Sequence, residues 1–493
     1  MAGGIHTAFY WSAIDRIAQG GCQFVLGIVL ARLLAPNEYG LIGMLTIFFA
    51  LAGAFSDAGL STGLIQRKTI SKDDETSVFI LNITVGAFLT LLLCAGAPCV
   101  AHFYKQPILS SLLCVLSLHV FISSMGIVQF ALLSRAMDFK SQTIIGGASI
   151  LVSGGFGIFL AVHGFGVWSL VAQALSRAVA SVALIWWFQP WRPSGRFRWC
   201  CIQSLWPFSS RLLAAGLFET AFQNLYSVLI GRVYTPVDLG YYDRANSTAI
   251  QPASNIAGIV LRVTLPYFSK IQEDRDKLKQ SFRVVIRILG SLHVPTMAGL
   301  AAIAGPLTEW MLTEKWMPCV AYFRILCFVG MLYPLHALHL NVLNAQGRSD
   351  LFFRLEVIKK VLSILTIAVT LSSGILTMVY GILASSIIGY FINAFYTFRF
   401  LHYSWREQAK DVIPIAGASL TMAGIVSVIG YFCSGRPLTI LLIQITCGIF
   451  LYSLFVWCGR KQTFHDLFKI ADKYWSDVMR KSPIRNMPKY DQR

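Results

Sequence analysis

Charged side chains interrupt several long apolar segments of this sequence, and they are its clearest candidates for chemistry. Asp15 and Arg16 lie in the first apolar segment, while Arg211 and Glu219 lie on nearly the same face of a later one. An ionised group within a membrane is costly unless it is paired or hydrated, so each is a candidate functional residue. A guanidinium binds phosphate-like anions through paired hydrogen bonds. We therefore predict an anion site that includes Arg16 and Arg211, with Asp15 beside it.

Two further arginines extend this candidate site. Arg262 lies at a depth similar to that of Arg211, and Arg244 lies toward the opposite end of its helix. Asp57 and Glu219 are the acids that we select for proton or cation coupling.

A simpler interpretation stays open for several of these residues. Arg16 and Arg211 can extend to lipid headgroups, and Asp15 can neutralise an arginine of a neighbouring helix. We interpret Arg177, Arg287 and Arg324 as anchors at helix ends. A stripe of polar residues in segment 319–345 indicates hydrogen bonds between helices, with a proton relay as the alternative. The stripe consists of His336, His339, Asn341 and Asn344.

The elements that carry these residues must be transmembrane helices. The chain has 493 residues, of which 56% are hydrophobic and 13% charged, and its mean hydropathy is +0.62. Apolar segments of at least about 18 residues recur along the chain, and each can cross a bilayer as a helix. We predict 14 spans, with bounds near 10–34, 40–64, 77–101, 108–133, 143–162, 165–188, 207–233, 238–266, 282–305, 319–345, 353–373, 376–398, 412–433 and 438–458.

Basic residues predict the orientation of these spans. Most of the 41 lysine and arginine residues fall in alternate loops and in the tail after the last span. The opposite side holds five, namely Lys105, Lys315 and Arg436 in loops and Arg32 and Arg232 at helix ends. The positive-inside rule then places both termini in the cytoplasm. We attribute the net charge of +18 to this cytoplasmic surface facing anionic lipids, and not to nucleic-acid binding.

A short polar motif occurs twice, as ARLLAPNEYG (31–40) and GRVYTPVDLG (231–240). Six predicted spans separate the copies, and an even number restores the direction of the chain. We therefore predict two parallel repeats of six helices, in which each proline ends a helix and each glycine permits a tight turn. The matched pairs are Arg32 and Arg232, Pro36 and Pro236, Glu38 and Asp238, and Gly40 and Gly240.

The predicted domains follow from this repeat. They are an N-lobe (1–206), a C-lobe (207–405), an appended pair of spans (406–460) and a basic cytoplasmic tail (461–493). The 11 cysteines lie mostly within apolar segments without metal-ligand spacing, so we expect neither disulfides nor a metal, and we expect no cofactor.

The repeat and several motifs resemble the polysaccharide-transporter branch of the multidrug/oligosaccharidyl-lipid/polysaccharide (MOP) exporter superfamily. These are Wzx-type flippases, among which the WzxC-like group is most similar. The motifs are LLAPNEYGLIGM (33–44), FSDAGLSTGLIQ (55–66), HGFGVWSLVAQAL (163–175), YTPVDLGYYDRA (234–245) and LNAQGRSDLFFRLEVIKK (343–360).

This resemblance implies an inner-membrane carrier that moves an undecaprenyl-pyrophosphate-linked oligosaccharide by alternating access, for O-antigen, capsule or exopolysaccharide synthesis. Its expected partners are the lipid-linked oligosaccharide, membrane lipids, a coupling proton or sodium ion and polysaccharide polymerase machinery. The arginines would then contact the diphosphate in a polar cavity between the lobes.

Two other functions compete with this interpretation. A cation-coupled multidrug exporter of the same superfamily would usually have 12 spans. A membrane polymerase or ligase would need a large outer loop, but the longest, about 306–318, is short. The sequence also lacks the GxxxxGK[ST], HExxH and GxSxG motifs, so we do not expect an enzyme.

Overall fold

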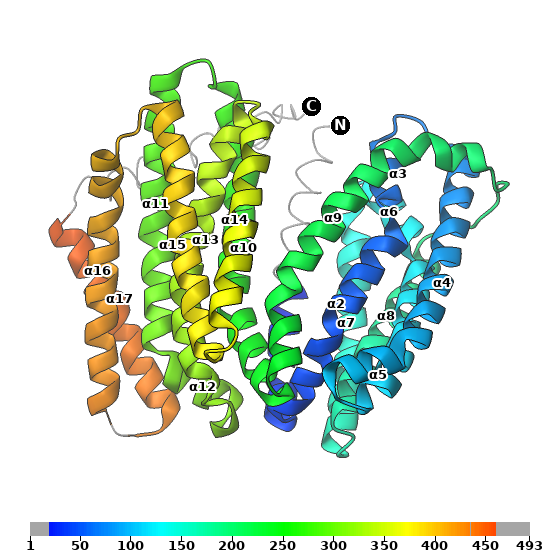
Figure 1. Ribbon diagram of the computed structural model, residues 1–493, viewed down its shortest axis with the longest axis horizontal. Coiled ribbons are helices and arrows are strands. Elements are labelled where there is room, and N and C mark those ends of the chain that lie inside the picture. Colours follow the sequence, from blue (N-terminus) through cyan, green and yellow to red (C-terminus); the bar gives the residue numbers. More distant parts are fainter. Residues whose placement is uncertain (1–18, 434, 460–493) are drawn as a thin grey trace, which may run out of the picture. The chain divides into compact units, whose positions relative to one another are not determined.

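The computed structural model describes residues 19–433 and 435–459, and within these residues every regular element is a helix (Figure 1). The chain forms two compact units. The first runs to Arg244 and includes Met311–Trp316, and the second comprises Ala245–Trp310 and the residues from Met317 onward. The predicted lobes are defined by the sequence repeat and not by contact, so their boundary at residue 206 stays a prediction.

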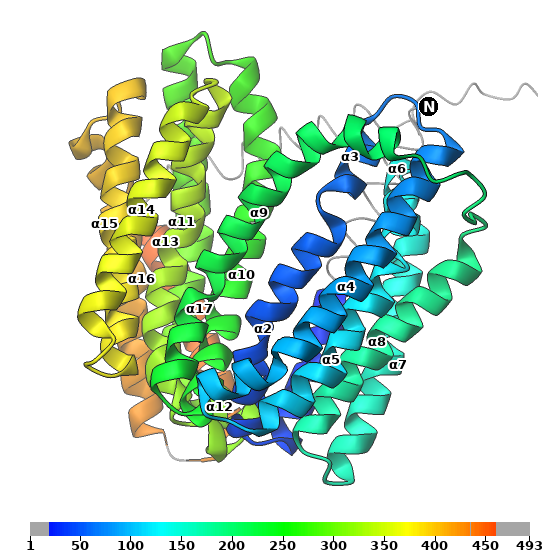
Figure 2. The same ribbon diagram turned by 45° about the vertical axis from the view of Figure 1, so that its right-hand side comes forward.

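In the first unit, α7 packs along α8, α4 along α5, and α5 along α8, so these four helices lie side by side (Figure 2). The long helix α9 packs on α2 and α4. The helices of this unit are Gln19–Leu33, α2 (Pro36–Asp57), α3 (Leu60–Gln66), α4 (Lys72–Tyr104), α5 (Ile108–Ser124), α6 (Ile127–Arg135), α7 (Phe139–Val162), α8 (Val167–Phe188), α9 (Trp199–Val233) and the start of α10 (Pro236–Lys270).

In the second unit, α11 packs on α13 and α16, and α15 packs on α13 and α14 (Figure 1). The appended helix α17 packs on α16, and the Tyr452 hydroxyl donates a hydrogen bond to the Ser291 carbonyl of α11 at 2.8 Å. The remaining helices are α11 (Arg275–Ala302), α12 (Ala304–Leu312), α13 (Cys319–Ala345), α14 (Ser349–Thr370), α15 (Ile375–Leu401), α16 (Trp405–Phe432) and α17 (Pro437–Gly459).

The helices confirm an all-α membrane protein. Among the described residues, nine helices are long and apolar enough to cross a bilayer, or ten if the bent pair α5 and α6 forms one span. Each predicted span overlaps a helix or a broken helix of the described chain. Because several of these, including α9, α10 and α14, do not meet the same criterion, the count of 14 spans stays a prediction.

The repeated motif forms the same local structure twice, but not the one that we expected. Pro36 and Pro236 begin α2 and α10 instead of ending a helix, a position that suits proline because the first helical N–H has no partner. Gly40 and Gly240 lie within these helices and not in tight turns. The expected roles of both residue types were therefore wrong.

The glycines allow the starts of α2 and α10 to approach each other. A Cβ atom on Gly40 would overlap the carbonyl oxygen of Pro236, and a Cβ atom on Gly240 would overlap the carbonyl oxygen of Pro36. The contact is reciprocal, so the two copies of the motif are each other's packing partners within the first unit.

The matched acids hold the starts of these helices. The Ala35 N–H donates to the Glu38 carboxylate at 2.5 Å, and the Thr235 N–H donates to the Asp238 carboxylate at 3.3 Å. Both acids lie in the first helical turn, where the helix dipole favours a negative charge.

We expect Gly240→Ala to lower the melting temperature of the detergent-purified protein by several degrees. The added methyl group meets a backbone carbonyl that cannot rotate away, and overpacking of this kind costs about 1–3 kcal/mol. The control is Gly258→Ala in the same helix, where a Cβ atom meets no atom within 4 Å. Equal melting temperatures for the two variants would contradict the close approach.

Candidate functional site

One face of α9 carries polar and charged side chains that are largely exposed. Arg211, Glu219 and Gln223 are all exposed, and the spacing between them keeps them on one side of the helix. The Gln223 amide donates to the Glu219 carboxylate at 3.0 Å. Phe218 and Phe222 pack ring against ring at 4.7 Å beside this stripe. The predicted shared face of Arg211 and Glu219 is therefore present.

Two predicted anion ligands are exposed and lack a side-chain partner in the part of the chain that the structure describes. Arg211 on α9 and Arg262 on α10 are exposed, and within the described residues neither forms an ion pair or a side-chain hydrogen bond. They belong to different units. An uncompensated guanidinium on a membrane helix must contact water, a headgroup or an anionic ligand.

Asp57 lies in a cavity of the first unit. The cavity has a volume of about 450 Å³, and its walls come from the end of α2, from α3, from the break between α5 and α6, and from α8. The Ser61 N–H and hydroxyl both donate to the Asp57 carboxylate, the former at 3.1 Å. Ser123, Ser134 and Ser181 also line the cavity. A carboxylate among hydroxyl groups offers oxygen atoms to a proton or a small cation.

Arg244 is enclosed by aromatic rings. Its guanidinium carbon lies 4.5 Å from the ring centre of Tyr39 and 5.2 Å from that of Trp316. Trp316 is fully buried, and its indole N–H donates to the Ala31 carbonyl at 2.8 Å. This arrangement anchors segment Met311–Trp316 on the first unit.

The polar stripe of α13 forms the hydrogen bonds between helices that its sequence predicts. His336 contacts Ser386 and Asn393 of α15 at 3.2 and 3.1 Å. His339 contacts Thr397 of α15 at 2.8 Å. The Asn341 amide donates to the Thr264 hydroxyl of α10 at 2.6 Å.

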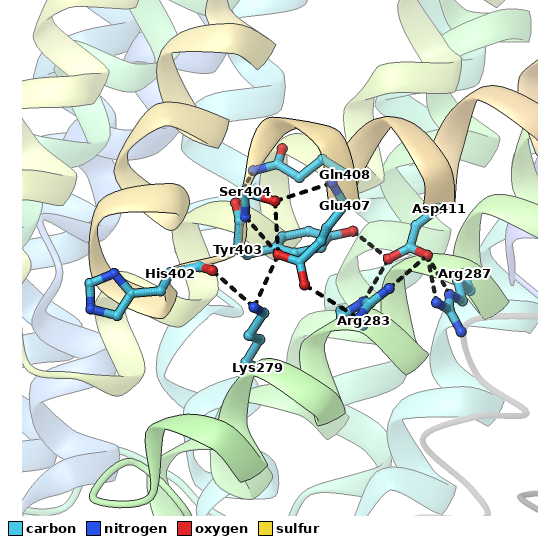
Figure 3. Close-up of polar contacts among 9 residues, drawn as sticks. All are labelled: Lys279, Arg283, Arg287, His402, Tyr403, Ser404, Glu407, Gln408 and Asp411. Atoms are coloured by element: carbon cyan, nitrogen blue, oxygen red, sulfur yellow. Dashed lines mark hydrogen bonds and ion pairs between the residues drawn. The ribbon is translucent and has the colours of Figure 1, made fainter.

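A second charged cluster joins α11 to α16, and sequence reasoning did not identify it (Figure 3). Asp411 of α16 is 1% exposed and accepts hydrogen bonds from Arg283, Arg287 and Tyr403. The nitrogen-to-oxygen distances are 2.8 Å for both Nε atoms, and the Tyr403 hydroxyl is also 2.8 Å away. Arg287 is thus a partner of a buried carboxylate rather than a free anchor at a helix end.

Glu407, one turn before Asp411, extends this cluster. Its carboxylate lies 3.0 Å from the Lys279 ammonium and 3.6 Å from the Arg283 guanidinium, and it also accepts the Ser404 N–H. Burial, together with the hydrogen bond to Asp411, raises the pKa of the Tyr403 hydroxyl above its usual range, so Tyr403 stays a donor.

A sequence signal for this cluster exists. Basic residues recur every four positions at Lys279, Arg283 and Arg287, and acids do so at Glu407 and Asp411. Each set therefore lies on one helical face. From the sequence alone, we placed the basic residues in loops and at helix ends. Nothing in one sequence shows that two helices more than 100 residues apart pack together.

Asp15 and Arg16 lie outside the described residues. No group of three or more histidine, cysteine, aspartate or glutamate side chains that could hold a metal is present among residues 19–433 and 435–459.

The sequence is similar to one protein family and to individual proteins from bacteria. Residues 29–321 match the family model described as "Polysaccharide biosynthesis protein". The chain is 26% identical to the lipopolysaccharide biosynthesis protein WzxC of Escherichia coli K12 over 392 residues, which covers 78% of this chain and 79% of that protein. It is also 26% identical to the teichuronic acid biosynthesis protein TuaB of Bacillus subtilis 168, over 70% of this chain and 71% of that protein.

Solved structures share the fold. The lipid II flippase MurJ in an inward closed conformation aligns with a TM-score of 0.71 at 15% identity, covering 90% of this chain and 98% of that one. An inward-facing multidrug resistance MATE family transporter of the MOP superfamily aligns with a TM-score of 0.60 at 15% identity, covering 80% and 99%. The chain therefore has a fold like that of MurJ and of this MATE transporter, and at this identity the likeness concerns the fold alone.

We expect Asp411→Ala to destabilise the purified protein strongly. The substitution leaves two arginines of α11 without their buried partner, and breaking a buried pair in this way costs about 3–5 kcal/mol. The measurement is the melting temperature in detergent. The control is Asp350→Ala, because the Arg348–Asp350 pair is exposed and solvent screens the attraction between its charges. A similar loss for both variants would show that the Asp411 cluster does not hold α16.

Proposed function

The chain belongs to the polysaccharide biosynthesis protein family, and from this premise we propose that it is a flippase for lipid-linked oligosaccharides. Its relatives are named for the biosynthesis of lipopolysaccharide and teichuronic acid, and its fold matches that of a lipid II flippase. The proposed cargo is an undecaprenyl-pyrophosphate-linked repeat unit for surface polysaccharide. The proposed mechanism is alternating access across the inner membrane.

The uncovered polar face of α9 carries this proposal. A lipid-linked oligosaccharide combines a diphosphate and a hydrated glycan with a polyprenyl chain, so its head needs a polar surface inside the membrane. The face with Arg211, Glu219 and Gln223 provides charge and hydrogen-bonding groups, and Phe218 provides an aromatic ring. On a membrane helix such a face is stable only where water or a polar ligand covers it.

We assign the diphosphate to arginines without protein partners. Arg211 and Arg262 fit this role because their guanidinium groups are exposed and unpaired within the described chain. Arg16 and Asp15 stay in the proposed site on sequence grounds. Arg244 was included as well, but its contacts with Tyr39 and Trp316 favour a role in anchoring segment Met311–Trp316.

We propose Asp57 and Glu219 as the acids that couple transport to a proton or sodium gradient. Asp57 faces a cavity lined with serines, and Glu219 is exposed on the polar face of α9. The orientation with both termini in the cytoplasm is proposed from the distribution of lysine and arginine residues. Polymerase machinery is the proposed downstream partner, because a flipped repeat unit is a substrate for elongation.

Arg211→Ala tests the cargo site. In a strain that lacks the chromosomal gene, we expect this variant to restore about 10-fold less surface polysaccharide than the wild type, because a hydrogen bond to a charged group contributes about 1.5–3 kcal/mol. Lipid-linked repeat units should accumulate at the same time. Surface polysaccharide and extracted lipid-linked glycans are measured together, at equal membrane levels of the protein.

Arg399→Ala is the matched control for that experiment. Arg399 is also exposed and has no ion pair within the described residues, but it lies in the last turn of α15. Full surface polysaccharide with Arg211→Ala would exclude this residue from the site. Export of small cationic drugs without any change in lipid-linked glycans would instead support a multidrug exporter.

Asp57→Asn tests coupling. We expect transport of the lipid-linked unit into inverted vesicles to lose its dependence on an imposed proton or sodium gradient, because the amide cannot change its charge. Ser61→Ala is the control, since it removes one hydrogen bond to Asp57 and keeps the carboxylate. An unchanged gradient dependence for Asp57→Asn would exclude this residue as the coupling acid.

A further inference from the structure

A second cavity lies in the second unit, at the opposite end of α11 and α16 from the Asp411 cluster. Its volume is about 550 Å³. The walls come from the last turns of α11, from α12, from the start of α13, from the second half of α16 and from α17. The cavity therefore lies beside the contact between the appended pair α16 and α17 and the helices on which the pair packs.

Small and apolar side chains form most of its walls. Ala301 and Ala302 of α11 face Ala423 and Gly424 of α16 across the cavity, and Phe328 of α13 adds an aromatic surface. A Cβ atom on Gly424 meets no atom within 4 Å, so the space beside this residue is open. These dimensions and this chemistry suit a hydrocarbon chain.

The walls are held in place by hydrogen bonds. The Gln444 amide of α17 donates to the Val426 carbonyl of α16 at 2.9 Å, and Gln444 is 2% exposed. Tyr431, at the end of α16, also lines the cavity and is 86% exposed, as expected for an aromatic residue at a membrane interface. The hydrogen bond from Gln444 thus joins α17 to α16 beside the cavity.

Arg324 is the charged residue of this cavity. It lies in the second turn of α13, is exposed, and has no ion pair or side-chain hydrogen bond within the described residues. Glu309 of α12 does not come within ion-pair distance of it. An unpaired guanidinium beside an apolar slot requires an anion whose other part is apolar.

We propose that this cavity binds an anionic phospholipid, with its phosphate on Arg324 and one acyl chain along Ala301, Ala302, Ala423 and Gly424. Charge complementarity selects the class of lipid. A phosphatidylglycerol headgroup carries one negative charge, whereas the ammonium group of phosphatidylethanolamine cancels the charge of its phosphate. A soluble phosphate would leave the apolar slot empty. The bound lipid would fill the space between α11 and α16 and so complete the packing of the appended pair.

The experiment uses the full-length protein, purified and delipidated in detergent, with dioleoyl-phosphatidylglycerol as the probe. We expect the lipid to raise the melting temperature and to remain bound in native mass spectrometry. Arg324→Gln should bind it at least about 10-fold more weakly, because a charge-assisted contact is lost. Arg399→Gln removes the same charge elsewhere in the second unit and should bind the lipid as the wild type does.

A second variant tests the acyl chain independently of the charge. A Cβ atom on Gly424 meets no atom within 4 Å, so we expect Gly424→Leu to fold and to bind the lipid more weakly because its side chain occupies the slot. Three results would overturn the proposal: equal binding of phosphatidylethanolamine, unchanged affinity in Arg324→Gln, and stabilisation by inorganic phosphate alone. Displacement of the lipid by undecaprenyl phosphate at equal concentration would also overturn it, because the cavity would then hold a polyprenyl chain.

Discussion

An ionised side chain within a membrane is unfavourable in free energy unless it is paired, enclosed or hydrated. The structure of this chain depends on that constraint, and its arginines satisfy it in three ways. The first is pairing, as in the Asp411 cluster, where one buried carboxylate receives two guanidinium groups and a tyrosine hydroxyl. The second is aromatic enclosure, as for Arg244. The third leaves the guanidinium without an ion pair or side-chain hydrogen bond to any described residue, as for Arg211, Arg262 and Arg324. The third class keeps all of its guanidinium N–H donors for a ligand, so the proposed anion contacts use these arginines.

The repeated motif shows how duplication and divergence combine. The glycines at equivalent positions keep the starts of α2 and α10 in reciprocal contact. Just after the motif the two copies differ, because Gly43 of the first corresponds to Asp243 of the second. A Cβ atom on Gly43 would meet the Asp243 carboxylate. That carboxylate accepts a hydrogen bond from the Ser227 hydroxyl at 2.8 Å. The first copy thus leaves space for the polar groups of the second. The contact between α2 and α10 can therefore hold a carboxylate on α10 alone, because Gly43 of α2 has no side chain to clash with Asp243.

The appended helices pack on α11 and also border a cavity. The Asp411 cluster joins the start of α16 to the start of α11, whereas about 550 Å³ lies between the far halves of the same helices. Ion pairs hold a fixed distance, and small residues on facing helices leave room for a chain of lipid. Under our proposal, a lipid bound in this cavity would add to the packing of the second half of α16.

Sequence alone determined the class of the protein, because hydropathy and helix length are local properties. It located the segments that became α4, α7, α8 and α17, the matched acids Glu38 and Asp238, and the shared face of Arg211 and Glu219. These follow from periodicity and from residue types within one helix. The resemblance to polysaccharide transporters likewise depended on motifs along the chain.

Tertiary structure decided which charges are free. Arg244 and Arg211 both lie within predicted apolar spans. In the structure, Tyr39 and Trp316 enclose Arg244, whereas Arg211 is exposed. Asp411 and Arg287 pair across a separation of 124 residues. Gly40 and Gly240 matter for a close approach of helices and not for turns, since the atom that excludes a side chain belongs to the other copy. Partners of this kind come from distant segments, so only the folded chain brings them together.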